Sequence, residues 1–211
     1  MTRRATAAFV VLAAADTVLA AGGRDRARRV TKPLLMPVLM AGRDRRTQWA
    51  LALGGAGDVA LLGSGDAAFT AGLATFLAGH LAWIAALRQH PGWGGRRVAA
   101  RPVLAVPYLA AFGAVNAFLW PRSGRYRVPI LAYSAVLLAM SLTALDRGSR
   151  SAAAGGALFL VSDSLLALEK FGGVRLPGHE GLVMATYSSA QALLATGCTP
   201  RTQLSRHGRG A

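Results

Sequence analysis

Charged residues and long apolar stretches alternate along this chain, and that alternation limits the folds that it can adopt. The arginines gather in clusters, which lie at 22–29, 42–46, 88–101 and 121–127, with smaller groups at 146–150 and 201–209. Most of the apolar stretches between them have roughly the length that a helix needs to cross a bilayer, about 17–25 residues. Because a segment inside a bilayer must satisfy its own backbone hydrogen bonds, these stretches predict α-helices.

We therefore expect an all-α polytopic integral membrane bundle of about eight transmembrane helices. The expected spans are 5–22, 30–41, 47–63, 67–87, 101–119, 127–145, 152–170 and 180–198, followed by a short basic tail at 199–211. Two glycines in GSGD at 63–66 separate the third span from the fourth, because glycine weakens a helix. Apolar and polar residues do not alternate steadily, so a transmembrane barrel is not expected. Residues 1–211 are interpreted as a single transmembrane domain.

The composition excludes several other classes of protein. With 53% hydrophobic and 16% charged residues, the chain is too apolar to be disordered. Its one cysteine, Cys198, has no partner for an internal disulfide. A net charge of +15 is often typical of nucleic-acid binding. Here the cations lie in predicted loops, where they set topology and contact anionic lipid head groups, so we expect a lipid bilayer as partner and no nucleic acid.

Loop arginines also indicate an orientation. With eight spans, more of them lie on the side of the two termini, which predicts a bacterial plasma-membrane protein with both termini in the cytoplasm. The run at 22–29 fits this topology poorly. The first segment has a second interpretation as a cleavable signal peptide, since Arg3 and Arg4 precede an apolar run that ends near Ala20-Ala21.

A few ionisable residues lie inside the expected spans, at a cost of at least about 2.5 kcal/mol for a central aspartate. They are Asp16, Lys32, Asp58, His80, Asp163, Glu169 and Lys170. Asp58 and Asp163 lie in similar contexts about half a chain length apart, so the bundle is interpreted as a possible duplication of a four-helix unit. Parallel copies would place the two carboxyl groups at similar depth.

Two carboxyl groups that face one cavity have a chemical use. One can stay protonated as a general acid while the other, ionised, acts as a base on water, so Asp58 and Asp163 are the candidate catalytic residues. The alternative is that each only joins helices through an arginine or a backbone donor. Asp16 has no partner that the sequence suggests.

Other polar residues are candidates for binding a substrate. Lys32 begins a predicted helix and could reach a phosphate or carboxylate, or extend to the interface. Tyr187 and Gln191 are four residues apart and share a helical face. Further polar candidates are His80, Asn116, Tyr133 and Ser162. For each of them, an interhelical hydrogen bond is a more common role than catalysis. Motifs for a nucleophile elbow, a phosphate-binding loop or a helical zinc site do not occur, so we expect no cofactor and no metal.

The motifs around these residues resemble, in order, those of the YhhN family of lysoplasmalogenase-like integral membrane proteins. The matching segments are TKPLLMP (31–37), GDVALLG (57–63), FTAGLATFLAGHLAWI (69–84), LAYSAVLLAM (131–140), GGALFLVSDSLLALEKF (155–171) and LVMATYSSAQALL (182–194). The resemblance implies an enzyme of about eight helices that hydrolyses the vinyl ether bond of lysoplasmalogens. It implies that Asp58 and Asp163 are the catalytic pair.

The same resemblance places Lys32, His80, Tyr187 and Gln191 along the cavity. SSAQ at 188–191 departs from the aromatic pattern usual in the family, which affects the fit of the substrate more than the chemistry.

A vinyl ether is hydrolysed when its β-carbon is protonated and water adds to the resulting oxocarbenium ion, which requires an acid, a base and an anionic environment. The expected substrate is a lysophospholipid, which yields a fatty aldehyde and a glycerophospho-base. The alternative function is a small membrane transporter or lipid-binding protein that uses the same polar cavity. The parallel repeat and the position of the prolines near span ends favour the enzyme.

Overall fold

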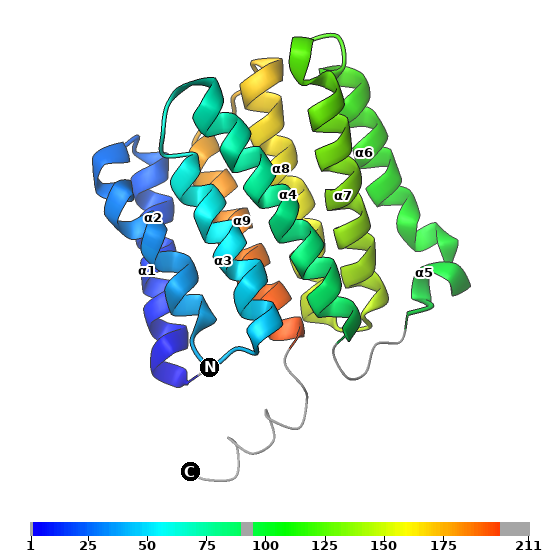
Figure 1. Ribbon diagram of the computed structural model, residues 1–211, viewed down its shortest axis with the longest axis horizontal. Helices are drawn as coiled ribbons and strands as arrows, with labels where there is room; N and C mark the ends of the chain where they lie inside the picture. Colours follow the sequence, from blue (N-terminus) through cyan, green and yellow to red (C-terminus); the bar gives the residue numbers. More distant parts are fainter. Residues whose placement is uncertain (1, 90–94, 199–211) are drawn as a thin grey trace.

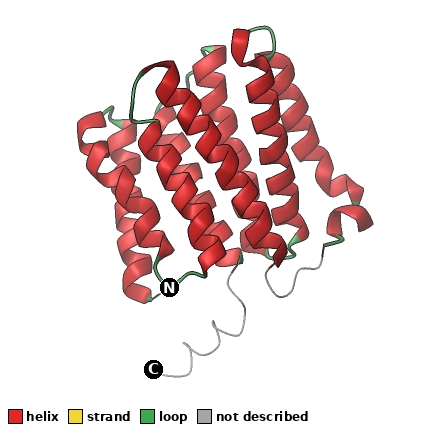
Figure 2. Ribbon diagram, in the orientation of Figure 1, coloured by secondary structure: helices red, strands yellow, loops and turns green. Residues whose placement is uncertain are grey.

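The computed structural model describes residues 2–89 and 95–198, and this part of the chain is helical without strands (Figure 2). Eight long helices run antiparallel to their neighbours in sequence, so that α1 begins and α9 ends at the same end of the bundle (Figure 1). They are α1 (Arg3–Ala21), α2 (Asp25–Met40), α3 (Arg45–Ala60), α4 (Gly65–Gln89), α6 (Val106–Leu119), α7 (Arg127–Asp146), α8 (Arg150–Gly172) and α9 (His179–Gly197). Shorter elements are α5 (Arg97–Ala100), η1 (Pro102–Ala105) and η2 (Gly124–Tyr126).

Five helical segments of the described chain are long and apolar enough to cross a membrane, which makes this an integral membrane protein. They are Arg3–Ala21, Gly65–Gln89, Pro102–Leu119, Gly124–Asp146 and Arg150–Gly172. Helices α2 and α3 have only 16 residues each. Helix α9 has 19 residues, but histidine, glutamate, glutamine and several hydroxyl side chains make it more polar. An all-helical membrane bundle is thus confirmed, whereas eight crossings stay a prediction.

One expected boundary was wrong. The second helix begins at Asp25 and not near residue 30, so most of the arginine run assigned to a loop is helical. Asp25 in the first turn favours this start, because a negative charge is stabilised at a helix N-terminus. The span expected at 101–119 is present as the helical segment Pro102–Leu119, in which η1 forms the first turn and α6 continues from Val106 with a proline in its first turn. The break expected at GSGD is present between α3 and α4.

Glycines allow the central helices to pack closely. Helix α8 lies against α9 where Gly155 faces Leu194, and a Cβ at position 155 would meet the backbone nitrogen of Leu194 at 2.8 Å. Helix α3 approaches α4 in the same way, since a Cβ at Gly57 would lie 2.7 Å from the ring of Phe76. Small residues at such crossings are the usual means of close packing between membrane helices. Gly57 and Gly155 therefore lie at helix contacts.

Replacing Gly155 by alanine is expected to destabilise the bundle. The new methyl group would clash with the backbone of α9, and backbone atoms cannot move aside as a side chain can. Helices α8 and α9 must therefore separate, which lowers the free energy of unfolding by about 1–3 kcal/mol. Gly113→Ala on α6 is the matched control, because a Cβ there meets nothing within 4 Å. Thermal unfolding in detergent should show a lower Tm for Gly155→Ala and an equal or higher Tm for Gly113→Ala. Equal Tm values for both variants would contradict the packing argument.

Candidate active site

A polar cavity of about 220 Å³ lies between α2, α3, α7, α8 and α9, and both candidate aspartates line it. Asp58 comes from α3 and Asp163 from α8. Lys32, Tyr133, Ser162 and Tyr187 also line the cavity. Further lining residues are Arg28, Leu61, Phe76, Leu166, Glu169, Glu180, Val183 and Met184. Two carboxyl groups that are 105 positions apart in the sequence therefore face one enclosed space.

Asp58 is buried and is held by two side chains from other helices. The Lys32 ammonium lies 3.3 Å from Oδ1, and the Tyr187 hydroxyl donates a hydrogen bond of 2.7 Å to Oδ2. Only 2% of the Asp58 side chain is exposed, so these contacts act with little screening by water. An adjacent cation and a hydroxyl donor both stabilise a negative charge on this carboxyl group.

Tyr187 is itself oriented by a chain of hydrogen bonds that leads away from the cavity. Gln191 Nε2 donates to the Tyr187 hydroxyl at 3.1 Å, and Trp83 Nε1 donates to Gln191 Oε1 at 3.1 Å. Trp83 and Gln191 are almost completely buried. The predicted shared face of Tyr187 and Gln191 is present, and Gln191 supports the tyrosine from behind without lining the cavity. Such second partners fix the geometry of a functional side chain.

Asp163 has different neighbours. The Tyr133 hydroxyl donates to Asp163 Oδ2 at 2.5 Å, and His80 Nε2 lies 2.9 Å from the same hydroxyl and 3.4 Å from that carboxyl oxygen. Since the hydroxyl donates its proton to Asp163, His80 Nε2 donates to Tyr133. The His80 ring is buried edge-on against Phe159. His80 thus lies behind Tyr133 and does not line the cavity, contrary to the expected role in contacting substrate.

The two aspartates are placed by equivalent sets of helices. Asp58, on the third long helix, contacts Lys32 of the second helix and Tyr187 of the last one. Asp163, on the third long helix of the second half, contacts Tyr133 of that half's second helix and His80 of the first half's fourth helix. Each acid thus receives one partner from its own half and one from the other. The pattern fits a duplicated unit, which stays a prediction.

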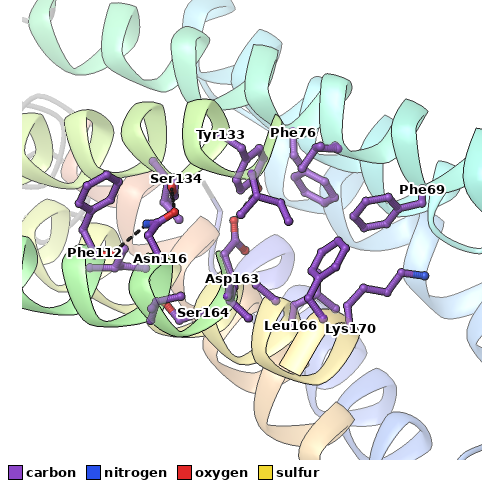
Figure 3. Close-up of a pocket in the computed structure, with 18 of the residues that line it drawn as sticks. Phe69, Phe76, Phe112, Asn116, Tyr133, Ser134, Asp163, Ser164, Leu166 and Lys170 are labelled. Atoms are coloured by element: carbon purple, nitrogen blue, oxygen red, sulfur yellow. Dashed lines mark hydrogen bonds between the residues drawn. The ribbon is translucent and has the colours of Figure 1, made fainter. Parts of the chain in front are cut away.

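A narrow apolar pocket of about 80 Å³ adjoins the polar cavity between α4, α6, α7 and α8. Asp163, Tyr133, Phe76, Leu61 and Leu166 border both spaces. Figure 3 shows the Asp163 carboxyl group near the middle of this pocket, with Tyr133 and Phe76 on one side and Leu166 on the other. The side chain of Asp163 is 12% exposed, which is more than that of Asp58. Asp163 therefore lies where a polar and an apolar compartment meet.

The remaining predicted residues have clear positions. Ser162 donates to the backbone oxygen of Val183 at 3.1 Å, so its hydroxyl joins α8 to α9 at the cavity wall. Asn116 donates to Phe112 O and accepts from Ser134 at 3.1 Å beside the apolar pocket. Lys170 lies over the Phe69 ring at the far end of that pocket.

Arg28 and Glu180 were missed by the sequence reasoning. Arg28 lines the cavity one helical turn before Lys32, and Glu180 lies opposite at 3.1 Å. Assigning residues 22–29 to a loop hid this register, because a helix from Asp25 puts Arg28 and Lys32 on one face. Asp16 also gains partners, since Thr31 donates to it at 2.5 Å and Arg28 Nε lies 3.8 Å away.

Chemically, the site combines two carboxyl groups in unlike surroundings with an adjoining apolar pocket. Asp58 sits beside a cation, whereas Asp163 contacts a tyrosine hydroxyl and a histidine. Unlike surroundings are what separates an acid from a base within a pair of carboxyl groups. Such a site can protonate a bound group, activate water and stabilise a developing cation beside an apolar chain.

Comparison with known proteins gives a family and a similarity to a curated human protein. The model of the YhhN family matches residues 27–198. Over 153 residues the chain is 31% identical to the Homo sapiens protein "Lysoplasmalogenase TMEM86B", an alignment that covers 72% of this chain and 63% of that protein. The chain thus spans less than two thirds of the length of this relative. No solved structure matches the chain.

The family match contains every candidate site residue, from Lys32 to Gln191, and the segments that first suggested the resemblance lie within it. It covers most of the chain and leaves out the first helix, the turn after it, the first two residues of α2 and the basic tail. This chain therefore belongs to the YhhN family of membrane proteins.

Proposed function

We propose that the protein is a membrane hydrolase that cleaves the vinyl ether bond of a lysoplasmalogen, with Asp58 and Asp163 as its catalytic pair. The observation that carries this proposal is the position of both aspartates on one cavity, with Asp163 at its junction with an apolar pocket. A lysoplasmalogen has a vinyl ether between an apolar chain and a polar glycerophospho-base. The junction suits that bond, and the similarity to a lysoplasmalogenase supports the same reaction class.

Asp163 is proposed as the general acid. With the alkenyl chain in the apolar pocket, its carboxyl group faces the β-carbon of the vinyl ether. Tyr133 occupies Oδ2 as a donor, which leaves Oδ1 to carry the proton. Transfer of that proton to the β-carbon uses the π-electrons to form the C–H bond. The α-carbon is left electron-deficient, and donation from the ether oxygen gives an oxocarbenium ion. The ionised Asp163 and the Asp58 carboxylate then stabilise that cation.

Asp58 is proposed as the base. Lys32 and Tyr187 stabilise its ionised form, so it can accept a proton from water as the water oxygen adds to the α-carbon. The resulting hemiacetal loses its hydroxyl proton while the glycerol oxygen gains one. The C–O bond breaks, and a fatty aldehyde and the glycerophospho-base are released. Return of the proton from Asp58 to Asp163 through cavity water completes the cycle, and the net reaction consumes one water molecule.

Asp58→Asn and Asp163→Asn are each expected to lower kcat for a lysoplasmalogen by at least about a hundredfold, because an amide neither donates nor accepts the proton. The measurement is aldehyde release by purified protein in detergent. Asp66→Asn is the matched control, since Asp66 is exposed at the start of α4 and pairs with Arg125 away from the cavity. Full activity in either site variant would refute the paired-acid mechanism. An inactive wild type with every vinyl ether lysolipid would refute the proposed reaction and favour the transporter or lipid-binding alternative.

Hydrolysis in heavy water gives a separate test of carbon protonation. The aldehyde, reduced to its alcohol as soon as it forms, should carry one deuteron on the carbon that was the β-carbon. We take proton transfer to the β-carbon as the slow step, so the rate should also fall in heavy water. Incubation of the unlabelled aldehyde with the enzyme in heavy water controls for exchange after release. Product without deuterium would exclude protonation of the vinyl ether.

The proposed orientation follows from the arginine distribution. We expect the end of the bundle where α1 begins and α9 ends to face the cytoplasm of a bacterial plasma membrane. A reporter domain active only in the cytoplasm, fused after residue 211, should then be active, and a reporter active only outside should be inactive. The reverse result would invert the topology without changing the site.

A further inference from the structure

Arg28 is a cavity residue without a role in the proposed chemistry. Its side chain is nine-tenths buried, although it belongs to a run of otherwise exposed arginines on α2. It lines the same cavity as the two aspartates and lies one helical turn, about 5.4 Å along the axis, from Lys32. Lys32 is committed to Asp58. Arg28 is the second cation of the cavity, and it does not contact either candidate catalytic aspartate.

Two acidic residues from other helices hold the Arg28 guanidinium. Glu180 at the start of α9 lies 3.1 Å from Nη1, and Asp16 on α1 lies 3.8 Å from Nε. Asp16 is completely buried, and its Oδ2 has no hydrogen-bond partner among the described residues. Both contacts engage the Nε and Nη1 side. Among the described residues, Nη2 makes no hydrogen bond, and a guanidinium can bind a phosphate oxygen through such a nitrogen.

The charge of the cavity makes a cation at this place necessary for an anionic ligand. Among the described lining residues there are four carboxyl groups, on Asp58, Asp163, Glu169 and Glu180, and two cations, on Arg28 and Lys32. Acidic walls suit an oxocarbenium ion but repel a phosphate. A lysophospholipid can enter such a cavity only if its phosphate lies against one of the cations.

We propose that Arg28 binds the phosphate of the substrate, and that Asp16 is a positioning residue that holds the guanidinium toward the cavity. This inference rests on the proposed function. With the chain in the apolar pocket and the vinyl ether at Asp163, the head group extends toward the end of the bundle where α2 and α9 begin. Arg28 and Glu180 lie at that end. In the substrate, the glycerol unit lies between the ether and the phosphate. In the protein, the cavity lies between Asp163, which faces the ether, and Arg28, which would face the phosphate.

The test compares two substrates, an alkenyl-glycerophosphoethanolamine and the corresponding alkenylglycerol, which has the same vinyl ether and no phosphate. For Arg28→Gln, the ratio of kcat/KM for the phosphorylated substrate to that for the phosphate-free one should fall at least tenfold, chiefly through KM. Arg28→Lys should restore part of the ratio. Arg29→Gln is the matched control, because it removes the same charge from an exposed position on the same helix. Its ratio should equal that of the wild type.

A structural role for Arg28 predicts a different result. If the arginine only joins α1, α2 and α9, its loss lowers activity on both substrates together and leaves the ratio unchanged, which would overturn the proposal. Wild-type hydrolysis of both substrates with an unchanged ratio in Arg28→Gln thus rejects the phosphate site and keeps the proposed function. If the wild type hydrolyses neither substrate, the proposed vinyl ether hydrolysis is itself rejected, and the phosphate site that rests on it is rejected as well.

Asp16→Asn tests the positioning role. Asparagine keeps an oxygen for the Thr31 hydroxyl but removes the charge that faces Arg28. The variant should lower the substrate ratio less than Arg28→Gln, again through KM. In the Arg28→Gln background it should lower the ratio no further, because Asp16 acts through the arginine. An additional loss of ratio in the double variant would show that Asp16 does not act through Arg28.

Discussion

Burial of ionisable groups within an apolar bundle is the constraint on which the rest of this structure depends. An unpaired charge in such surroundings is costly, so each buried acid must find a donor or a cation on another helix. Asp16 joins α1 to α2, Asp58 joins α3 to α2 and α9, and Asp163 joins α8 to α7 and α4. The contacts that make these acids tolerable also position the helices around the cavity. Stability and the candidate site are therefore built from the same side chains.

The sequence predicted the helices and the two central acids because apolar length and rare buried charge are local signals. The turn at 63–66 followed from its two glycines, and the shared face of Tyr187 and Gln191 followed from their four-residue spacing. The predictions that failed concerned residues whose positions depend on tertiary contacts. The arginine run appeared to be a loop by charge, yet Asp25 starts a helix there and Arg28 turns inward to Asp16 and Glu180.

Similarly, no spacing rule could have separated the polar residues that line the cavity from those behind it. His80 and Gln191 act on Tyr133 and Tyr187, whereas the tyrosines contact the aspartates. Trp83 completes one of these chains from a helix far away in the sequence. A single sequence shows which residues are polar in an apolar segment, but their order from the cavity outward depends on how α4, α7 and α9 pack.

The exchange of partners between the two halves has a consequence for ancestry. Under the predicted duplication, a symmetrical forerunner would have been a pair of four-helix units with two chemically identical aspartates, each completed by the opposite unit. In the present chain one aspartate has a lysine beside it, while the other has a tyrosine backed by a histidine. Fusion of the units into one polypeptide is what allows the two neighbourhoods to differ. In the fused chain the acid and the base can therefore be fixed to particular residues, whereas in a strict homodimer either aspartate can take either role.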